Sequence, residues 1–176
     1  MAKINFVERT IKTDEMCSSF NCGNAILDNF IRYDSCNTSI SKTYLMIEDD
    51  TKLIGFYSLC CSSLLEIKDE KNNIESSAPA ICLKMFAIDK KYQDKIIDGY
   101  EHTYAHFMLT VCLDKIKEIK NQYIGAECII LNSTQEGYEL YKNVGDFYEL
   151  ESDYELPDYN ENPNAIKMYR SIDNML

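Results

Sequence analysis

Arginine is scarce in this sequence. Its 176 residues include three arginines, and Lys and Arg together number 18 against 29 Asp and Glu, which gives a formal net charge of −11. A broad nucleic-acid surface needs clustered Lys and Arg, so we do not expect a nucleic-acid partner. The acidic excess either serves solubility alone or attracts a cationic substrate or partner.

Long apolar runs are also absent. No stretch approaches the roughly 18 consecutive apolar residues of a membrane-spanning helix, and residues 1–5 do not begin a secretory signal. The apolar fraction is 45%, which is normal for a globular protein. We therefore expect a cytoplasmic protein without membrane contact, folded as one domain over residues 1–176.

Cysteine is plentiful, but no C-x-x-C pair occurs, so the usual zinc and thioredoxin spacings are missing. Without a secretory signal, reduced thiols are the default, and most of these cysteines lie in apolar runs. His102 and His106 share one helical face but lack a third ligand, so we interpret them as a solvated surface and expect no metal. The eight cysteines are Cys17, Cys22, Cys36, Cys60, Cys61, Cys82, Cys112 and Cys128.

Strand and helix patterns alternate along the chain, which favours a layered α/β or α+β fold. Apolar residues at helical spacing predict helices over residues 23–34 and 99–119. A capping box at Ser133–Glu136 predicts a third helix that ends near Gly145. Strands are predicted over residues 4–7, 43–48, 52–67, 80–89, 125–131, 147–151 and 165–172.

One stretch near the C-terminus, residues 143–166, contains no Lys or Arg. Like charges in such a block repel one another and favour an exposed loop. Its acidic residues are Asp146, Glu149, Glu151, Asp153, Glu155, Asp158 and Glu161.

Several short motifs follow one another in a recognisable order. They are Phe20-Asn21-Cys22-Gly23-Asn24, Ile54-Gly55-Phe56-Tyr57-Ser58-Leu59, Pro79 before a strand that ends Phe86-Ala87-Ile88-Asp89, then Leu140-Tyr141-Lys142 and Gly145-Asp146-Phe147. Together with the element order, they resemble the GNAT N-acetyltransferases, in the subgroup that includes acetyltransferase toxins of toxin–antitoxin pairs. The resemblance covers residues 3–172. It implies a central mixed, mostly antiparallel sheet flanked by helices.

The resemblance also implies acetyl-CoA as cosubstrate. The pantetheine arm would pair with the main chain of Phe86, Ala87 and Ile88, as an added strand does. Asn132, at the end of the next strand, would contact CoA. The pyrophosphate would lie on backbone N–H groups that lead into a helix N-terminus. By position, these residues are Gln93, Asp94, Lys95, Ile96, Ile97, Asp98 and Gly99.

This pyrophosphate segment departs from the family pattern Gln/Arg-x-x-Gly-x-Gly/Ala. Ile96 and Asp98 occupy the two small-residue positions, which adds a β-branched side chain and a negative charge beside the phosphates. Asp98 could instead be a first-turn cap of the helix, and a register slip could bring Gly99 into the loop. The departures favour an alternative function, a catalytically inactive GNAT-fold module that binds a partner or another ligand.

Tyr141 matches the GNAT tyrosine that protonates the departing CoA thiolate, which a phenol can do as a general acid. The alternative is a core tyrosine, with Tyr138 as the backup donor. No general base stands out.

The acidic balance favours the primary amine of a cationic small molecule or protein as acceptor. The other alternative is a toxin that acts on aminoacyl-tRNA, against which the net charge argues. A homodimer stays open.

Overall fold

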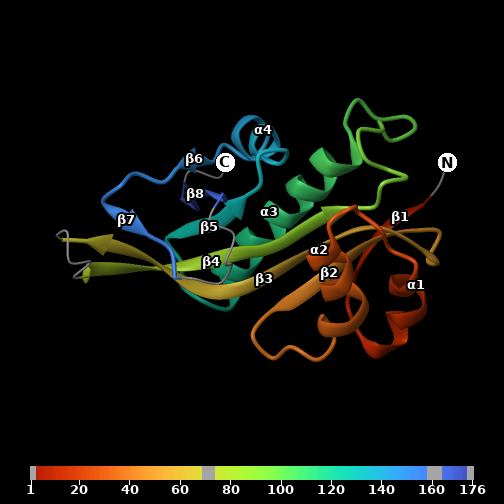
Figure 1. The fold of residues 1–176 in the computed structure, drawn as a ribbon, viewed down its shortest axis with the longest axis horizontal. Helices are drawn as coiled ribbons and strands as arrows, with labels where there is room; N and C mark the ends of the chain where they lie inside the picture. Colours follow the sequence, from red (N-terminus) through yellow and green to blue (C-terminus); the bar gives the residue numbers. More distant parts are fainter. Residues whose placement is uncertain (1–2, 69–73, 158–163, 174–176) are drawn as a thin grey trace. The chain divides into compact units, whose positions relative to one another are not determined.

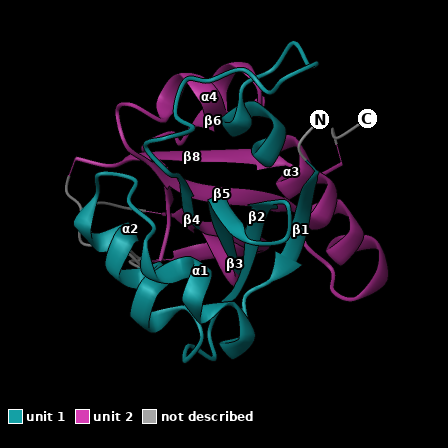
Figure 2. Cartoon of the chain, turned by 90° about the vertical axis from the view of Figure 1, so that its right-hand side faces the viewer, with its two compact units in different colours: residues 1–59, 85–109 teal, residues 60–84, 110–176 magenta. Residues whose placement is uncertain are grey.

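The structure, a computed structural model, describes residues 3–68, 74–157 and 164–173. The chain forms two compact units (Figure 2). Unit 1 comprises residues 1–59 and 85–109, and unit 2 comprises residues 60–84 and 110–176. Three elements, β3 (Lys52–Ile67), β4 (Ile74–Ile88) and α3 (Tyr104–Gln122), run from one unit into the other. The single domain expected over residues 1–176 stays a prediction.

Unit 1 contains four neighbouring strands in the order β1-β2-β3-β4. β1 (Ile4–Glu8) pairs antiparallel over its whole length with β2 (Lys42–Glu48), and β2 pairs antiparallel with the first half of β3. Asp49 and Asp50 form the turn between β2 and β3 with φ values of 48° and 59°. Asp tolerates this left-handed region better than most side chains, which suits both residues to the turn.

Short helices cover one face of the unit 1 strands (Figure 1). They are the 3-10 helix η1 (Ile11–Thr13), α1 (Asp14–Ser18), α2 (Ala25–Asn29) and the π-helix η2 (Phe30–Asp34). Asn24 caps α2, because its side-chain oxygen accepts the N–H groups of Ile26 and Leu27. Their apolar side chains join those of the strands in one core cluster: Cys17, Phe20, Phe30, Ile31, Leu45, Ile47, Leu53, Phe56 and Ala87.

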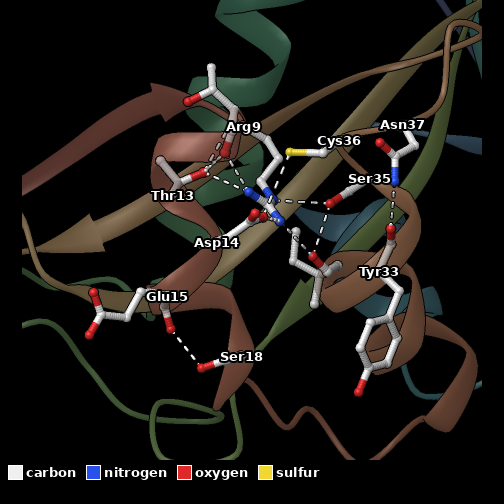
Figure 3. Close-up of polar contacts among 11 residues, drawn as sticks. Arg9, Thr13, Asp14, Glu15, Ser18, Tyr33, Ser35, Cys36 and Asn37 are labelled. Atoms are coloured by element: carbon white, nitrogen blue, oxygen red, sulfur yellow. Dashed lines mark hydrogen bonds and ion pairs between the residues drawn. The ribbon is translucent and has the colours of Figure 1, made fainter.

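Arg9 holds the end of β1 to these helices (Figure 3). Its side chain is 1% exposed and forms a salt bridge of 2.5 Å with Asp14. The guanidinium also donates to the hydroxyls of Thr13 (2.9 Å) and Ser35 (3.1 Å) and to the carbonyl oxygen of Thr10 (2.5 Å). A buried cation requires such partners to offset its lost hydration. Arg9 is therefore a structural residue of unit 1.

Unit 2 contains the mixed part of the sheet. β4 pairs in parallel with β5 (Cys128–Ser133), which pairs antiparallel with β8 (Ile166–Ser171). β8 pairs with β6 (Tyr148–Glu149), and β7 (Tyr154–Glu155) pairs with the second half of β3, both antiparallel. The predicted α+β class with a mixed, mostly antiparallel sheet is confirmed.

The acidic stretch 143–166 contains β6, within the strand predicted over residues 147–151, and also β7, where only an exposed loop was expected. Asp158 and Glu161 lie outside the described residues.

Two predicted helix starts are wrong. Ser133 is the last residue of β5, where it pairs with Ile166, and its hydroxyl donates to the Thr134 carbonyl, so it caps no helix. α4 runs from Tyr138 to Asn143 instead. The long helix α3 begins at Tyr104, five residues after the expected Gly99. Among the described residues, no helix is both long and apolar enough to cross a membrane.

Candidate functional site

The end of β4 is fixed by Asp89, the first residue after the strand. Asp89 is 4% exposed. Its carboxylate accepts the N–H groups of Asn21 (3.0 Å) and Lys91 (2.9 Å), and its own N–H donates to Ile54 (2.8 Å). The Phe86–Asp89 motif therefore ends in a buried carboxylate that holds the following turn in place.

Gln93 anchors that turn through its side chain. Its amide nitrogen donates to the carbonyl oxygens of Ile88 (2.8 Å) and Cys22 (2.9 Å). Asp94, the next residue, has φ 57°, a conformation that costs glycine nothing. These bonds position the turn against the Phe20–Asn24 motif, and they use both N–H groups of the Gln93 amide.

A short loop, closed at its base by a β-bridge, separates this turn from α3. Ile96 and Thr103 form an isolated antiparallel bridge. Beside it, Ile97 N–H donates to the His102 carbonyl (3.1 Å), and Tyr104 N–H donates to the Lys95 carbonyl (3.2 Å). The bridge brings Lys95 next to Tyr104 and leaves residues 96–102 as an insert with its own turn.

The insert exposes some apolar side chains and buries another. Ile96 is 61% exposed and Tyr100 is 55% exposed, whereas Ile97 is 5% exposed and packs into the core. Gly99 has φ 83°, which favours glycine at this turn position. Ile97 is therefore a core anchor of the insert.

Thr103 caps α3, because its hydroxyl accepts the His106 N–H at 3.2 Å. Asp98 lies five residues before Thr103 and outside the first helical turn, so its interpretation as a first-turn cap is wrong. With the insert set aside, Gln93-Asp94-Lys95 continues in space into Thr103-Tyr104-Ala105. This order puts Ala105 at the last small-residue position of the family pattern. Sequence reasoning missed it because the bridge leaves no periodic signal.

Tyr141 lies in unit 2, on α4, and is 8% exposed. Burial raises the pKa of its phenol well above 10, and the nearby Cys112 raises it further. The Gly145-Asp146-Phe147 motif folds back onto it: Phe147 N–H donates to the Tyr141 carbonyl at 3.1 Å, and the two rings lie 6.0 Å apart, edge to face. Tyr141 therefore carries a phenol that stays protonated across the physiological range.

The two other predicted side chains of unit 2 differ in their partners. Tyr138 donates its hydroxyl to Glu149 at 2.5 Å. The Asn132 Oδ1 is buried and has no hydrogen-bond partner among the described residues. A buried acceptor without a donor is costly and rare in proteins. Asn132 is thus suited to receive a donor from a ligand, as CoA amides could supply.

Among the described residues, no group of three or more His, Cys, Asp or Glu side chains is arranged so that it could hold a metal ion. His102 and His106 stack with ring centroids 4.0 Å apart. Burial lowers the pKa of His106, and His102 beside it lowers it further. The pair is therefore close to α3's cap without forming a ligand set.

No family model matches this chain, and no curated protein matches it in sequence. Solved structures do match. A structure described as a bacterial toxin has a TM-score of 0.74 and 18% identity over 98% of this chain and 93% of its own. AtaTR bound with AcCoA has a TM-score of 0.68 and 19% identity over 97% and 94%. AtaT complexed with acetyl-methionyl-tRNAfMet has a TM-score of 0.71 and 17% identity over 97% and 96%.

This chain has the GNAT fold. The similarity covers nearly the whole length of both partners in each comparison. The GNAT resemblance inferred from the motifs is therefore confirmed for the fold. At these identities the comparisons say nothing about individual site residues.

Proposed function

We propose that the chain is an N-acetyltransferase that moves an acetyl group from acetyl-CoA to a primary amine. The observation that carries the proposal is the protonated, buried phenol of Tyr141 at the family's tyrosine position in a GNAT fold. Two further observations support it. AtaTR, which has the same fold, is described as bound with AcCoA, and Asn132 offers a buried acceptor without a donor.

We assign the pyrophosphate to the Gln93–Lys95 turn and the first turn of α3. The N–H groups of Tyr104 and His106 already donate to Lys95 and to Thr103, so Ala105 is the first-turn N–H that we assign to phosphate. The partial positive charge of the helix N-terminus favours an anion there. This assignment keeps a pyrophosphate site at the helix N-terminus and places Ile96 and Asp98 outside it.

The rest of the cosubstrate follows the family pattern. The main chain of Phe86, Ala87 and Ile88 would pair with the pantetheine arm, and Asn132 would accept one of its amide N–H groups. The amine nitrogen then attacks the thioester carbonyl carbon, a C–N bond forms, and the C–S bond breaks. Tyr141 donates its proton to the departing sulfur and regains one from solvent.

Charge favours a cationic acceptor. Unit 2 contains nine Lys and Arg against seventeen Asp and Glu, whereas unit 1 contains nine against twelve. In the acidic stretch, Asp146 pairs with Arg170 and Glu155 pairs with Lys167, but Glu151 and Asp153 have no ion pair among the described residues. An uncompensated acidic surface raises the local concentration of cations. Polyamines and lysine side chains meet this requirement.

A second acceptor, the amine of an aminoacyl-tRNA, is supported by the similarity to AtaT in complex with acetyl-methionyl-tRNAfMet. The net negative charge of the whole chain argues against a tRNA acceptor, but most of the acidic excess lies in unit 2. Unit 1 has a pocket of about 720 Å³ that is lined by three lysines, Lys12, Lys52 and Lys91, and by three carboxylates, Glu15, Asp50 and Asp89. Lysines around a pocket can bind phosphate groups. An antitoxin partner, as AtaR is for AtaT, and a homodimer both stay predictions.

A CoA-release assay with three acceptors separates these candidates. We expect saturable release with spermidine, and a KM for spermidine that rises with salt because the attraction is screened. A lysine-rich peptide serves as the protein acceptor, and charged methionyl-tRNA as the third. If CoA is released with charged methionyl-tRNA and with neither of the other two acceptors, aminoacyl-tRNA would replace the cationic acceptor in the proposal. Release with none of the three would contradict the cationic and tRNA acceptors and favour the inactive binding module.

A further inference from the structure

Two cysteines face each other across neighbouring strands of unit 2. Cys60 is on β3 and Cys82 is on β4, and a side-chain hydrogen bond joins them. Both side chains belong to one apolar cluster, which also contains Ala80, Cys128 and Ile130. This dithiol has no part in the proposed acetyl transfer.

The two cysteines lie on antiparallel neighbouring strands. β3 and β4 run in opposite directions, because Asp89 bonds to Ile54 near one end and Ser76 bonds to Glu66 (2.5 Å) near the other. The side chains of Cys60 and Cys82 interact across these strands and share one apolar cluster, so they lie on the same face of the sheet. Opposite residues have Cα atoms about 4.5–5.5 Å apart, within the ~4.4–6.8 Å that a disulfide spans.

The surroundings give the two thiols different roles. Cys82 is 7% exposed, whereas Cys60 is half-buried and can meet a small solute. The hydrogen bond to Cys82 lowers the pKa of Cys60 to about 7, and Lys84 lowers it further against the effect of burial. The same hydrogen bond and burial raise the pKa of Cys82. At neutral pH about half of the Cys60 thiol is therefore ionised, whereas its neighbour Cys82 is a thiol.

We propose that Cys60 and Cys82 are an oxidisable dithiol that closes a cross-strand disulfide between β3 and β4 in the presence of a peroxide. The Cys60 thiolate attacks hydrogen peroxide, its sulfur is oxidised to sulfenic acid, and hydroxide leaves. The Cys82 sulfur then attacks the sulfenic sulfur, the S–S bond forms, and the Cys82 proton leaves with the hydroxyl as water. The hydroxide released in the first step takes up one proton from solvent, so the peroxide is reduced to two molecules of water per disulfide.

The proposal also names which cysteines do not take part. Cys61 is exposed, but neighbouring strand residues point to opposite faces, so it cannot reach Cys82. Cys128 lies opposite Ala80 in the parallel pair of β4 and β5, two residues away from the position opposite Cys82. Cys61 is more exposed than Cys60, so exposure alone would predict Cys61 as the reactive cysteine. Cys128 lies in the same apolar cluster as Cys60, so membership of that cluster alone would not predict which of the two pairs with Cys82.

Peptide mass spectrometry of the full reduced chain tests the proposal. The protein is treated with a small excess of hydrogen peroxide, unfolded, and alkylated with iodoacetamide. We expect a mass loss of 2 Da from one internal disulfide, a linked Cys60–Cys82 peptide that thiol reductant releases, and two fewer alkylated cysteines. In the untreated native protein, Cys60 should be alkylated at half its maximal rate near pH 7.

Two serine variants complete the test. Cys61→Ser should leave the Cys60–Cys82 link unchanged, whereas Cys60→Ser should abolish it and leave Cys82 fully alkylated after unfolding. A Cys82–Cys128 link, intermolecular links through Cys61, or no internal disulfide in the wild-type chain would each overturn the proposal. The wild-type result does not depend on whether a variant folds.

Discussion

The variant Tyr141→Phe should lower kcat of acetyl transfer by about 10²-fold, the usual scale of one general acid. The phenol hydroxyl is the only group removed, and the ring keeps its edge-to-face contact with Phe147. The dissociation constant for acetyl-CoA should therefore stay within about twofold of wild type. Stopped-time CoA release and calorimetry measure the two quantities on the same preparation.

The pH profile provides an independent check on Tyr141. Because burial raises its pKa above the ordinary 10.0, the phenol should remain a proton donor throughout pH 7–10, and kcat should not fall there through its ionisation. The protein's stability should decline above about pH 10, where the unfolded phenol ionises and the buried one does not. Tyr138→Phe is the matched control, because its hydroxyl bonds to Glu149. Unchanged kcat in Tyr141→Phe would remove Tyr141 from its assigned role.

The variant Ala105→Asp should weaken acetyl-CoA binding by about 100-fold or more. It places a carboxylate in the first turn of α3, where we assign the pyrophosphate, and the like charges repel. The same carboxylate suits a helix N-terminus in the absence of a ligand, so the unfolding temperature of the unliganded variant should not fall. Calorimetric titration with acetyl-CoA and a thermal melt separate lost binding from lost folding.

Asp98→Ala is the control that distinguishes the two placements of the loop. Asp98 lies in the insert between Ile96 and Thr103, and we expect its removal to leave acetyl-CoA affinity unchanged. If Asp98 instead lay beside the phosphates, removing its charge would tighten binding. Tighter acetyl-CoA binding by Asp98→Ala, together with unchanged acetyl-CoA binding by Ala105→Asp, would contradict our assignment of the pyrophosphate to the Gln93–Lys95 turn and Ala105.

Features set by local sequence were predictable. The helix expected over residues 23–34 corresponds to α2 and η2, because Asn24 supplies a side-chain cap and Phe30 and Ile31 supply the buried face. The order of strands along the chain followed from patterns of the same kind, whereas the GNAT fold followed from the resemblance of the short motifs to that family. Propensity and periodicity act over a few residues, so a single sequence records them.

Features set by distant contacts were not predictable. Ser133 matches a capping box, yet its pairing with Ile166 keeps it in β5. Ile96 and Thr103 close the insert through a bridge that no spacing rule reveals, and this moved the start of α3. For the candidate site, the family resemblance of the sequence predicted Tyr141 and Asn132. The burial of Tyr141 and the lack of a partner for the Asn132 Oδ1 among the described residues depend on the tertiary structure, so the sequence could not predict them.

The most direct test of the central claim is the melting temperature of the full chain as acetyl-CoA is titrated to millimolar concentration. The account predicts a saturable rise in melting temperature. At 100 times the dissociation constant, the stabilisation would be about 2.7 kcal/mol, which is several degrees for a chain of this size. Desulfo-CoA, which keeps the pyrophosphate, should stabilise similarly, and inorganic phosphate should not. No shift at millimolar acetyl-CoA would contradict the account.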